Sequence, residues 1–78
     1  MKINLAEING FGREASFIAN VIFTQHRNRS KKLSGLLALL KSGHSVTMPS
    51  FSMDCLIIDG HAQKWEILES PIISAVRP

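Results

Sequence analysis

The sequence is poor in residues that cross-link a chain or bind metals. It contains one cysteine, Cys55, one tryptophan and no tyrosine. A single cysteine excludes a disulfide within the chain and a cysteine-rich zinc module. The longest unbroken apolar run, residues 36–40, has five residues, against the roughly 20 that span a bilayer. Residues 1–4 carry one basic residue and no apolar stretch of the kind found in secretory signals. We therefore expect a cytoplasmic protein that makes no contact with membranes.

The chain is also short. Its 78 residues, 45% hydrophobic and 19% charged, predict one compact domain over residues 1–78. A chain of this size buries only about 60% of the surface that its unfolded form exposes, so self-association is a common source of added stability. Apolar residues exceed what one core face per element requires, namely Ile18, Ile22, Leu39, Ile72, Ile73 and Val76. This excess favours a homodimer or a surface for a larger partner over a merely apolar monomer surface.

The first half of the chain predicts two strands and a helix. Residues 2–8 are typical of a short strand, and Asn9-Gly10 of a turn. Residues 15–25 carry both an alternating apolar pattern, which indicates a strand, and a helical spacing of apolar residues. Their β-branched and aromatic content favours the strand, with the helix as the alternative. Residues 30–42 have a leucine stripe at helical spacing, with Ser30 to cap the start and Gly43 to end the helix.

The second half predicts further strands. Residues 44–48 suit a short strand, and residues 53–68 a hairpin around Asp59-Gly60. A three-residue loop, residues 59–61, would place Cys55 opposite Trp65 on an apolar face, so we expect that register. Residues 72–76 would form an edge strand or a docked tail. The expected fold is therefore α+β, a small antiparallel sheet of four to five strands with one packed helix, in the order β-β-α-β-β-β.

Positive charge is concentrated in residues 26–32, called the basic segment from here on. It holds four of the nine lysines and arginines, whereas the rest of the chain has five basic and six acidic residues. The candidate binding residues are His26, Arg27, Arg29, Lys31 and Lys32. Lysines in the first turn of a helix oppose its dipole at a cost of about 0.3–1 kcal/mol each when exposed. This placement indicates an anion nearby, either phosphate or the carboxylates of a partner, unless the segment is simply a solvated loop.

Catalytic chemistry has little support in the sequence. The three histidines and Cys55 lack the spacing of metal ligands, and no glycine-rich phosphate loop or nucleophile motif is present. Cys55, facing Trp65 in the expected register, would be an inert buried thiol. We therefore expect no enzyme activity, no catalytic or metal-binding residues and no cofactor.

Two classes of function remain. The first is a small non-enzymatic interaction protein that regulates or inhibits a larger protein or complex by occupying its surface, with residues 27–32 contacting acidic groups. The second is a small dimeric nucleic-acid-binding regulator that uses the same residues on phosphates. A modest net charge of +3, the absence of tyrosine and phenylalanines that suit the core better than a binding face favour protein binding.

Overall fold

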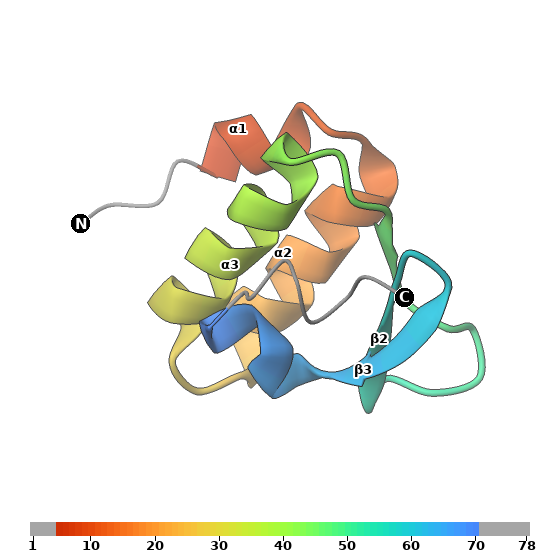
Figure 1. Cartoon of the computed structure of the whole chain (residues 1–78). Coiled ribbons are helices and arrows are strands. Elements are labelled where there is room, and N and C mark those ends of the chain that lie inside the picture. Colours follow the sequence, from red (N-terminus) through yellow and green to blue (C-terminus); the bar gives the residue numbers. More distant parts are fainter. Residues whose placement is uncertain (1–4, 71–78) are drawn as a thin grey trace.

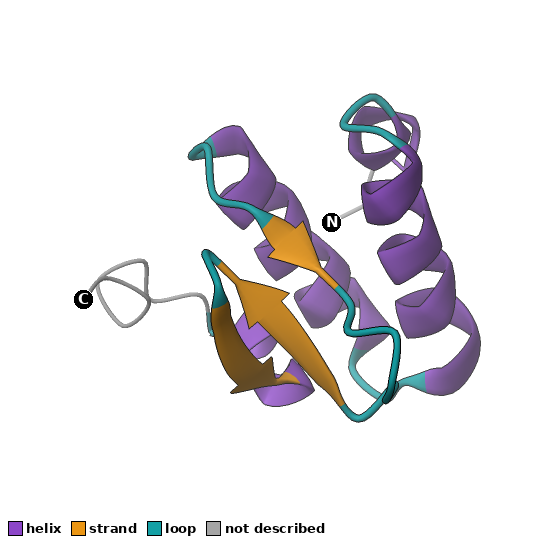
Figure 2. Cartoon of the chain, turned by 90° about the vertical axis from the view of Figure 1, so that its right-hand side faces the viewer, coloured by secondary structure: helices purple, strands orange, loops and turns teal. Residues whose placement is uncertain are grey.

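A computed structural model describes residues 5–70 of the chain. The elements in chain order are α1 (Leu5–Asn9), α2 (Arg13–Gln25), α3 (Arg29–Lys41), β1 (Val46–Thr47), β2 (Cys55–Ile58), β3 (His61–Lys64) and the 3-10 helix η1 (Trp65–Glu69). Helices α2 and α3 lie side by side and run in opposite directions (Figure 1). The strands form a separate layer on one side of the helices (Figure 2). Within the described residues, no helix is long and apolar enough to cross a membrane.

The fold class is mixed α+β, but the expected number and order of elements are wrong. The described residues contain three α-helices followed by a three-stranded antiparallel sheet in the order β1-β2-β3. The expected arrangement of four to five strands with a single helix, β-β-α-β-β-β, is therefore overturned. The strand or tail expected at residues 72–76 lies outside the described residues.

Residues 15–25 form a helix. The residues that are buried there follow the helical spacing of apolar residues rather than the alternating pattern. Ile18 and Ile22, one turn apart, are fully buried in α2, whereas Phe17 and Phe23 of the alternating set are exposed. A continuous buried face on one side of a helix outweighs the strand propensity of its β-branched residues. Ile18 and Ile22 are therefore core residues, as is Leu39 on α3, and none of the three belongs to a surplus that would need a partner.

The prediction of a strand at residues 2–8 is also wrong. Residues 5–9 form the short helix α1, which buries Ile8 against α2. The connection that follows is a helical turn, since the amide of Gly10 donates to the carbonyl of Ala6 and that of Phe11 to Ile8. The positive φ angle occurs at Gly12, with φ 115°, a conformation that favours glycine. α2 begins directly after it.

The helix expected over residues 30–42 is present as α3. The expected stripe was Leu33, Leu36, Leu37 and Leu40. Leu33 and Leu36 are buried, whereas Leu37 and Leu40 are only partly buried and Leu39 is buried instead. Gly43 follows its end with φ 87°, the left-handed stop expected of it. The start differs, because Asn28 precedes the first helical residue and Ser30 lies inside the helix, without capping it.

The hairpin turns at Asp59-Gly60 as expected, but its register is the two-residue one. Asp59 and Gly60 both have positive φ, 50° and 84°, as in the two-residue turns that match strand twist. Cys55 consequently pairs with Lys64 rather than with Trp65. The buried face of β2 carries Leu56 and Ile58, so that Cys55 lies half-buried on the other face.

The core extends through both layers and is aliphatic apart from one indole ring. Its buried members are Ile8, Ala15, Ile18, Ala19, Val21, Ile22, Leu33, Leu36, Leu39, Val46, Leu56, Ile58, Trp65 and Leu68. η1 closes it by packing on α3, where Leu68 crosses Gly35. The indole Nε1 of Trp65 donates to the carbonyl of Met53 at 2.9 Å, which satisfies the one polar atom of that buried ring.

Candidate interaction surface

The basic segment lies where α2 ends and α3 begins. Arg27, Arg29 and Lys31 are exposed, whereas the side chain of His26 is half-buried. Within residues 5–70, none of those three cations forms an ion pair with a carboxylate. Their positive charge is therefore open to solvent at one end of the helical pair.

Lys32 is the exception within the basic segment. Only 3% of it is exposed, and its Nζ lies 2.9 Å from Oε2 of Glu69 and donates to the carbonyl of Arg27 at 2.6 Å. The same carboxylate accepts a hydrogen bond from Nδ2 of Asn28 at 3.1 Å. The bond from Lys32 is the main reason why the pKa of Glu69 lies below its ordinary value of 4.5. Lys32 thus neutralises a carboxylate of this chain and fixes η1 to the basic segment, which leaves it unsuited to contact a partner.

His26 also contacts η1. Its ring centre lies 4.3 Å from that of Trp65, with the ring planes inclined at 43°. Burial, followed by the charge of Lys32, lowers the pKa of His26 below its ordinary value of 6.5, while Glu66 acts in the opposite direction. His26 therefore favours the neutral form and adds packing rather than charge to this end of the molecule.

Arg29 connects the basic segment to the surface of α2. Its Nη1 donates to the carbonyl of Phe23 at 3.1 Å, which satisfies an acceptor in the last turn of α2. Its guanidinium carbon lies 4.4 Å from the centre of the Phe23 ring, the geometry of a cation–π contact. The guanidinium has five N–H donors, so most of them remain free for a carboxylate or phosphate.

All four phenylalanines of the chain are exposed, so the expectation that they fill the core is wrong. Between 46% and 84% of each is accessible, with Phe51 the most exposed. Phe17 and Phe23 are both exposed on α2, about 120° apart around the helix, while Phe51 lies in the loop between β1 and β2. Exposed aromatic rings beside cations are a frequent feature of binding surfaces.

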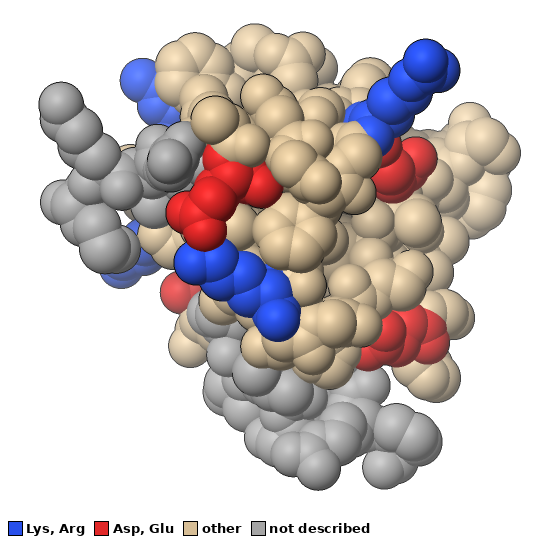
Figure 3. Space-filling view, turned by 90° about the horizontal axis from the view of Figure 1, so that it is seen from above, with Lys and Arg blue, Asp and Glu red and all other residues tan. Residues whose placement is uncertain are grey.

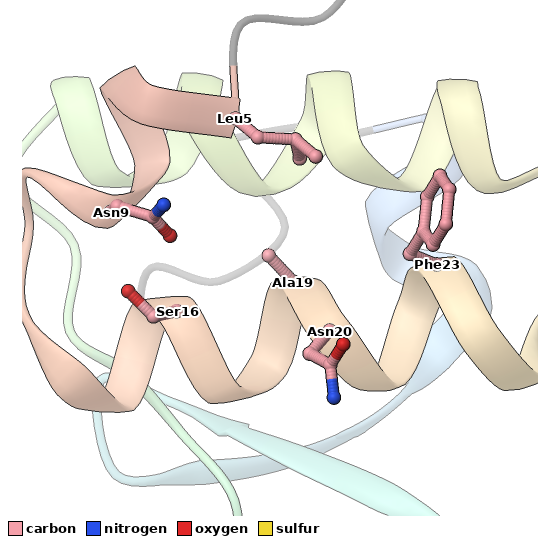
Figure 4. A pocket seen from close by; sticks show the side chains of 6 residues that line it. All are labelled: Leu5, Asn9, Ser16, Ala19, Asn20 and Phe23. Atoms are coloured by element: carbon pink, nitrogen blue, oxygen red, sulfur yellow. The ribbon is translucent and has the colours of Figure 1, made fainter.

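A hollow of about 190 Å³ lies beside Phe23, between α1 and α2. It is lined by Leu5, Asn9, Ser16, Ala19, Asn20 and Phe23. In Figure 4 the ring of Phe23 stands at the end of the hollow away from Asn9, toward the start of α3. Leu5, Ala19 and Phe23 provide apolar walls, and the side-chain amides of Asn9 and Asn20 provide polar groups at the rim. We call this hollow together with Phe17, Phe23, Arg27 and Arg29 the α2 surface.

The opposite end of the molecule differs in charge. Figure 3 looks onto the end away from the α2–α3 connection, and there basic and acidic side chains are scattered among uncharged residues. Further from the basic segment, Lys41 forms an ion pair with Glu7, and Nδ1 of His44 contacts the carboxylate of Asp59. In the part of the chain that the structure describes, no three metal-binding side chains lie close enough together to hold an ion.

No family model, curated protein or solved structure matches this chain. Sequence analysis predicted the cationic residues of the α2 surface but missed its apolar residues. Leu5, Ala19 and Phe23 become neighbours only because residues 5–9 and 13–25 are helices, so the strand assignment concealed them. The helical spacing of residues 16, 20 and 23 is the one signal that could have revealed this face.

Proposed function

We propose that this chain is a small non-enzymatic interaction protein that occupies the surface of a larger protein through its α2 surface. The partner contributes an apolar patch to Phe17, Phe23 and the hollow, and acidic side chains to Arg27 and Arg29. Regulation or inhibition of the partner would follow from covering its surface.

The observation that carries this proposal is the position of Phe17 and Phe23. They are 51% and 46% exposed although the chain has a core that buries eight large aliphatic side chains completely. The exposed part of each ring contributes nothing to folding, whereas a ring buried at an interface can contribute about 2 kcal/mol or more to binding. Phe23 is in addition a wall of the hollow and contacts Arg29, so that an apolar centre and a cation adjoin each other on this face.

The charges favour an acidic partner. Arg29 contacts Phe23, Arg27 lies two residues before Arg29 in the chain, and neither pairs with an acidic group among residues 5–70. Lys31 is nearby, but its charge acts on Glu69, where it helps to lower the pKa of that carboxyl. Arginine binds carboxylates in a bidentate geometry, so Arg27 and Arg29 are the residues that we expect to set partner choice.

The proposal is tested with the full chain immobilised as bait in a lysate of its source cells. A captured protein is purified and titrated by calorimetry against Phe23→Ser and Arg27→Glu. We expect each change to weaken binding about tenfold or more. Phe51→Ser in the loop after β1 and Lys64→Glu on β3 make comparable chemical changes at exposed positions away from α2, and should leave the affinity within twofold.

Two results would contradict the proposal. One is equal weakening by Phe51→Ser and Phe23→Ser, which would place the interface elsewhere or show non-specific adhesion. The other is capture that disappears after nuclease treatment, which would transfer the binding to nucleic acid.

A second candidate function is supported by the contact between Arg29 and Phe23. An exposed ring beside free guanidinium groups can stack on an unpaired base while the cations bind phosphates, which fits a small dimeric regulator that binds nucleic acid. In that case Arg27→Gln and Lys31→Gln should weaken binding to random single strands by similar factors, and each should reduce the salt slope by about one unit. At a protein interface their effects should differ sharply.

Two further proposals concern the state of the chain. We propose a cytoplasmic location, because a single free cysteine suits a compartment in which thiols stay reduced. We also propose that it forms a homodimer, because a chain of this size gains stability from association. Sedimentation at micromolar concentration tests the dimer, and a monomer mass across the range would reject it.

A further inference from the structure

The hollow and Arg29 share one aromatic ring, that of Phe23, which restricts what a partner can present to them. Phe23 lines the hollow at the end toward the start of α3, and its ring centre is 4.4 Å from the guanidinium carbon of Arg29. A ligand that fills the hollow therefore contacts a ring that also carries a cation.

Volume and shape limit the apolar part of the ligand. Sites for drug-sized molecules are usually about 300–1,000 Å³, whereas this hollow has about 190 Å³. Its length along α2, from Ser16 to Phe23, is about 10 Å at 1.5 Å per residue. That space suits one large side chain, held as an anchor, and not a whole helix.

The neighbouring charge determines the rest of the ligand. Arg29 is held in place by its bond to the Phe23 carbonyl, so part of the entropy of ordering its side chain is already lost before binding. Because an extended chain advances about 3.3–3.6 Å per residue, a carboxylate two or three residues from the anchor would reach it.

From this geometry we infer that the α2 surface recognises a short segment of the partner in which one large apolar residue, seated in the hollow, is followed or preceded within three residues by an acidic residue bound to Arg29. This inference rests on the proposed function and names the chemistry of its partner. Phe23 serves both halves of the motif, as a wall of the hollow and as the support of the guanidinium.

The test uses a displayed library of random 12-residue peptides, panned against the full wild-type chain. We expect enrichment of sequences that combine a large apolar residue with Asp or Glu within three positions. Ser16→Leu fills the hollow from its wall, and Asn20→Glu places a carboxylate at its rim. Either change should lower the affinity for the enriched peptides at least tenfold, whereas Ser50→Leu, the same substitution in the exposed loop after β1, should not.

Circular dichroism establishes that each variant is folded, and Asn20→Glu, at an exposed position, keeps the test decisive if Ser16→Leu unfolds the chain. The inference would be overturned if panning did not enrich this pattern. It would also be overturned if Ser16→Leu and Asn20→Glu both bound the enriched peptides as tightly as the wild type. A dimer that Ser16→Leu converts to monomer would likewise overturn it, since a second copy would then fill the hollow. In each of these cases the proposed function is judged separately, by the effect of Arg27→Glu on the captured partner.

Discussion

The carbonyl group of Leu68 lies directly over Gly35. A Cβ atom on residue 35 would be 1.7 Å from the Leu68 oxygen, closer than any real contact. The obstacle is backbone rather than a movable side chain, so η1 can approach α3 only because residue 35 has no side chain.

We predict that Gly35→Ala destabilises the protein, although alanine is the better helix former by about 1 kcal/mol. The added methyl group must push η1 away from α3, and overpacking of this kind costs about 1–3 kcal/mol or more. Chemical denaturation monitored by circular dichroism gives the difference. Ser34→Ala, at the preceding position of α3, is the control and should change stability little. A Gly35→Ala variant as stable as the wild type would mean that η1 does not pack as described.

A second prediction concerns the hairpin turn. The Asp59 carboxylate accepts hydrogen bonds from the backbone of Ser45 and from His44, and these, in that order, lower its pKa below the ordinary value of 3.8. Because the folded-state pKa is the lower one, this stabilisation is complete above pH 3.8 and is lost as the pH falls through the folded value.

Asp59→Asn should therefore lower the melting temperature at pH 7 and remove part of the acid-induced loss of stability below pH 3.8. Asp59→Val should lower the melting temperature further, since a β-branched residue strongly disfavours the observed φ of 50°. Thermal melts between pH 2.5 and 7 measure both effects. Equal melting temperatures for the two variants would contradict the role of the turn conformation.

A third prediction concerns His26. Its pKa lies below 6.5 in the folded chain, chiefly through burial and then through Lys32, with Glu66 opposing. The sign is that of a group that binds its proton more weakly when folded. The contribution of neutral His26 to the free energy of unfolding is complete above pH 6.5. It is lost as the pH falls through the lower pKa of His26 in the folded chain.

The pH dependence of stability between pH 5 and 7 should therefore be shallower in His26→Gln than in the wild type, whatever the absolute stability of the variant. Gln25→Asn, which changes no titratable group at the exposed position before His26, is the control and should retain the wild-type slope. Urea denaturation at five pH values gives these slopes. Identical slopes for the wild type and His26→Gln would contradict the burial of the ring against Trp65.

Local signals in the sequence predicted part of the fold correctly. The helix α3, its glycine stop and the turn at Asp59-Gly60 depend on residues close together in the chain, and all three are present. The strand at residues 44–48 is present as the two residues of β1. The helix α2 was missed because residues 15–25 satisfy both periods, and only the packing of Ile18 and Ile22 against the rest of the core selects one.

The positions of the charged residues in the candidate site were predictable from the sequence. Which of them are exposed and which are paired within the chain was not. Lys32 and Arg27 are equivalent in the sequence pattern, yet one is buried against Glu69 and the other is exposed. The two members of that ion pair are separated by 37 positions, and no local pattern links them. The predicted hairpin register is wrong for a similar reason. Pairing Cys55 with Trp65 required Trp65 to belong to the strand, whereas Trp65 is the first residue of η1.

Trp65 gives the protein a built-in optical reporter. With one tryptophan and no tyrosine in the chain, near-ultraviolet emission comes from this indole ring alone. The ring contacts His26, the first residue of the basic segment, and follows β3 directly. Arg27 and Arg29 lie one and three residues after His26 in the chain. Binding at these arginines can therefore be followed on the unlabelled chain by the wavelength and intensity of the Trp65 emission.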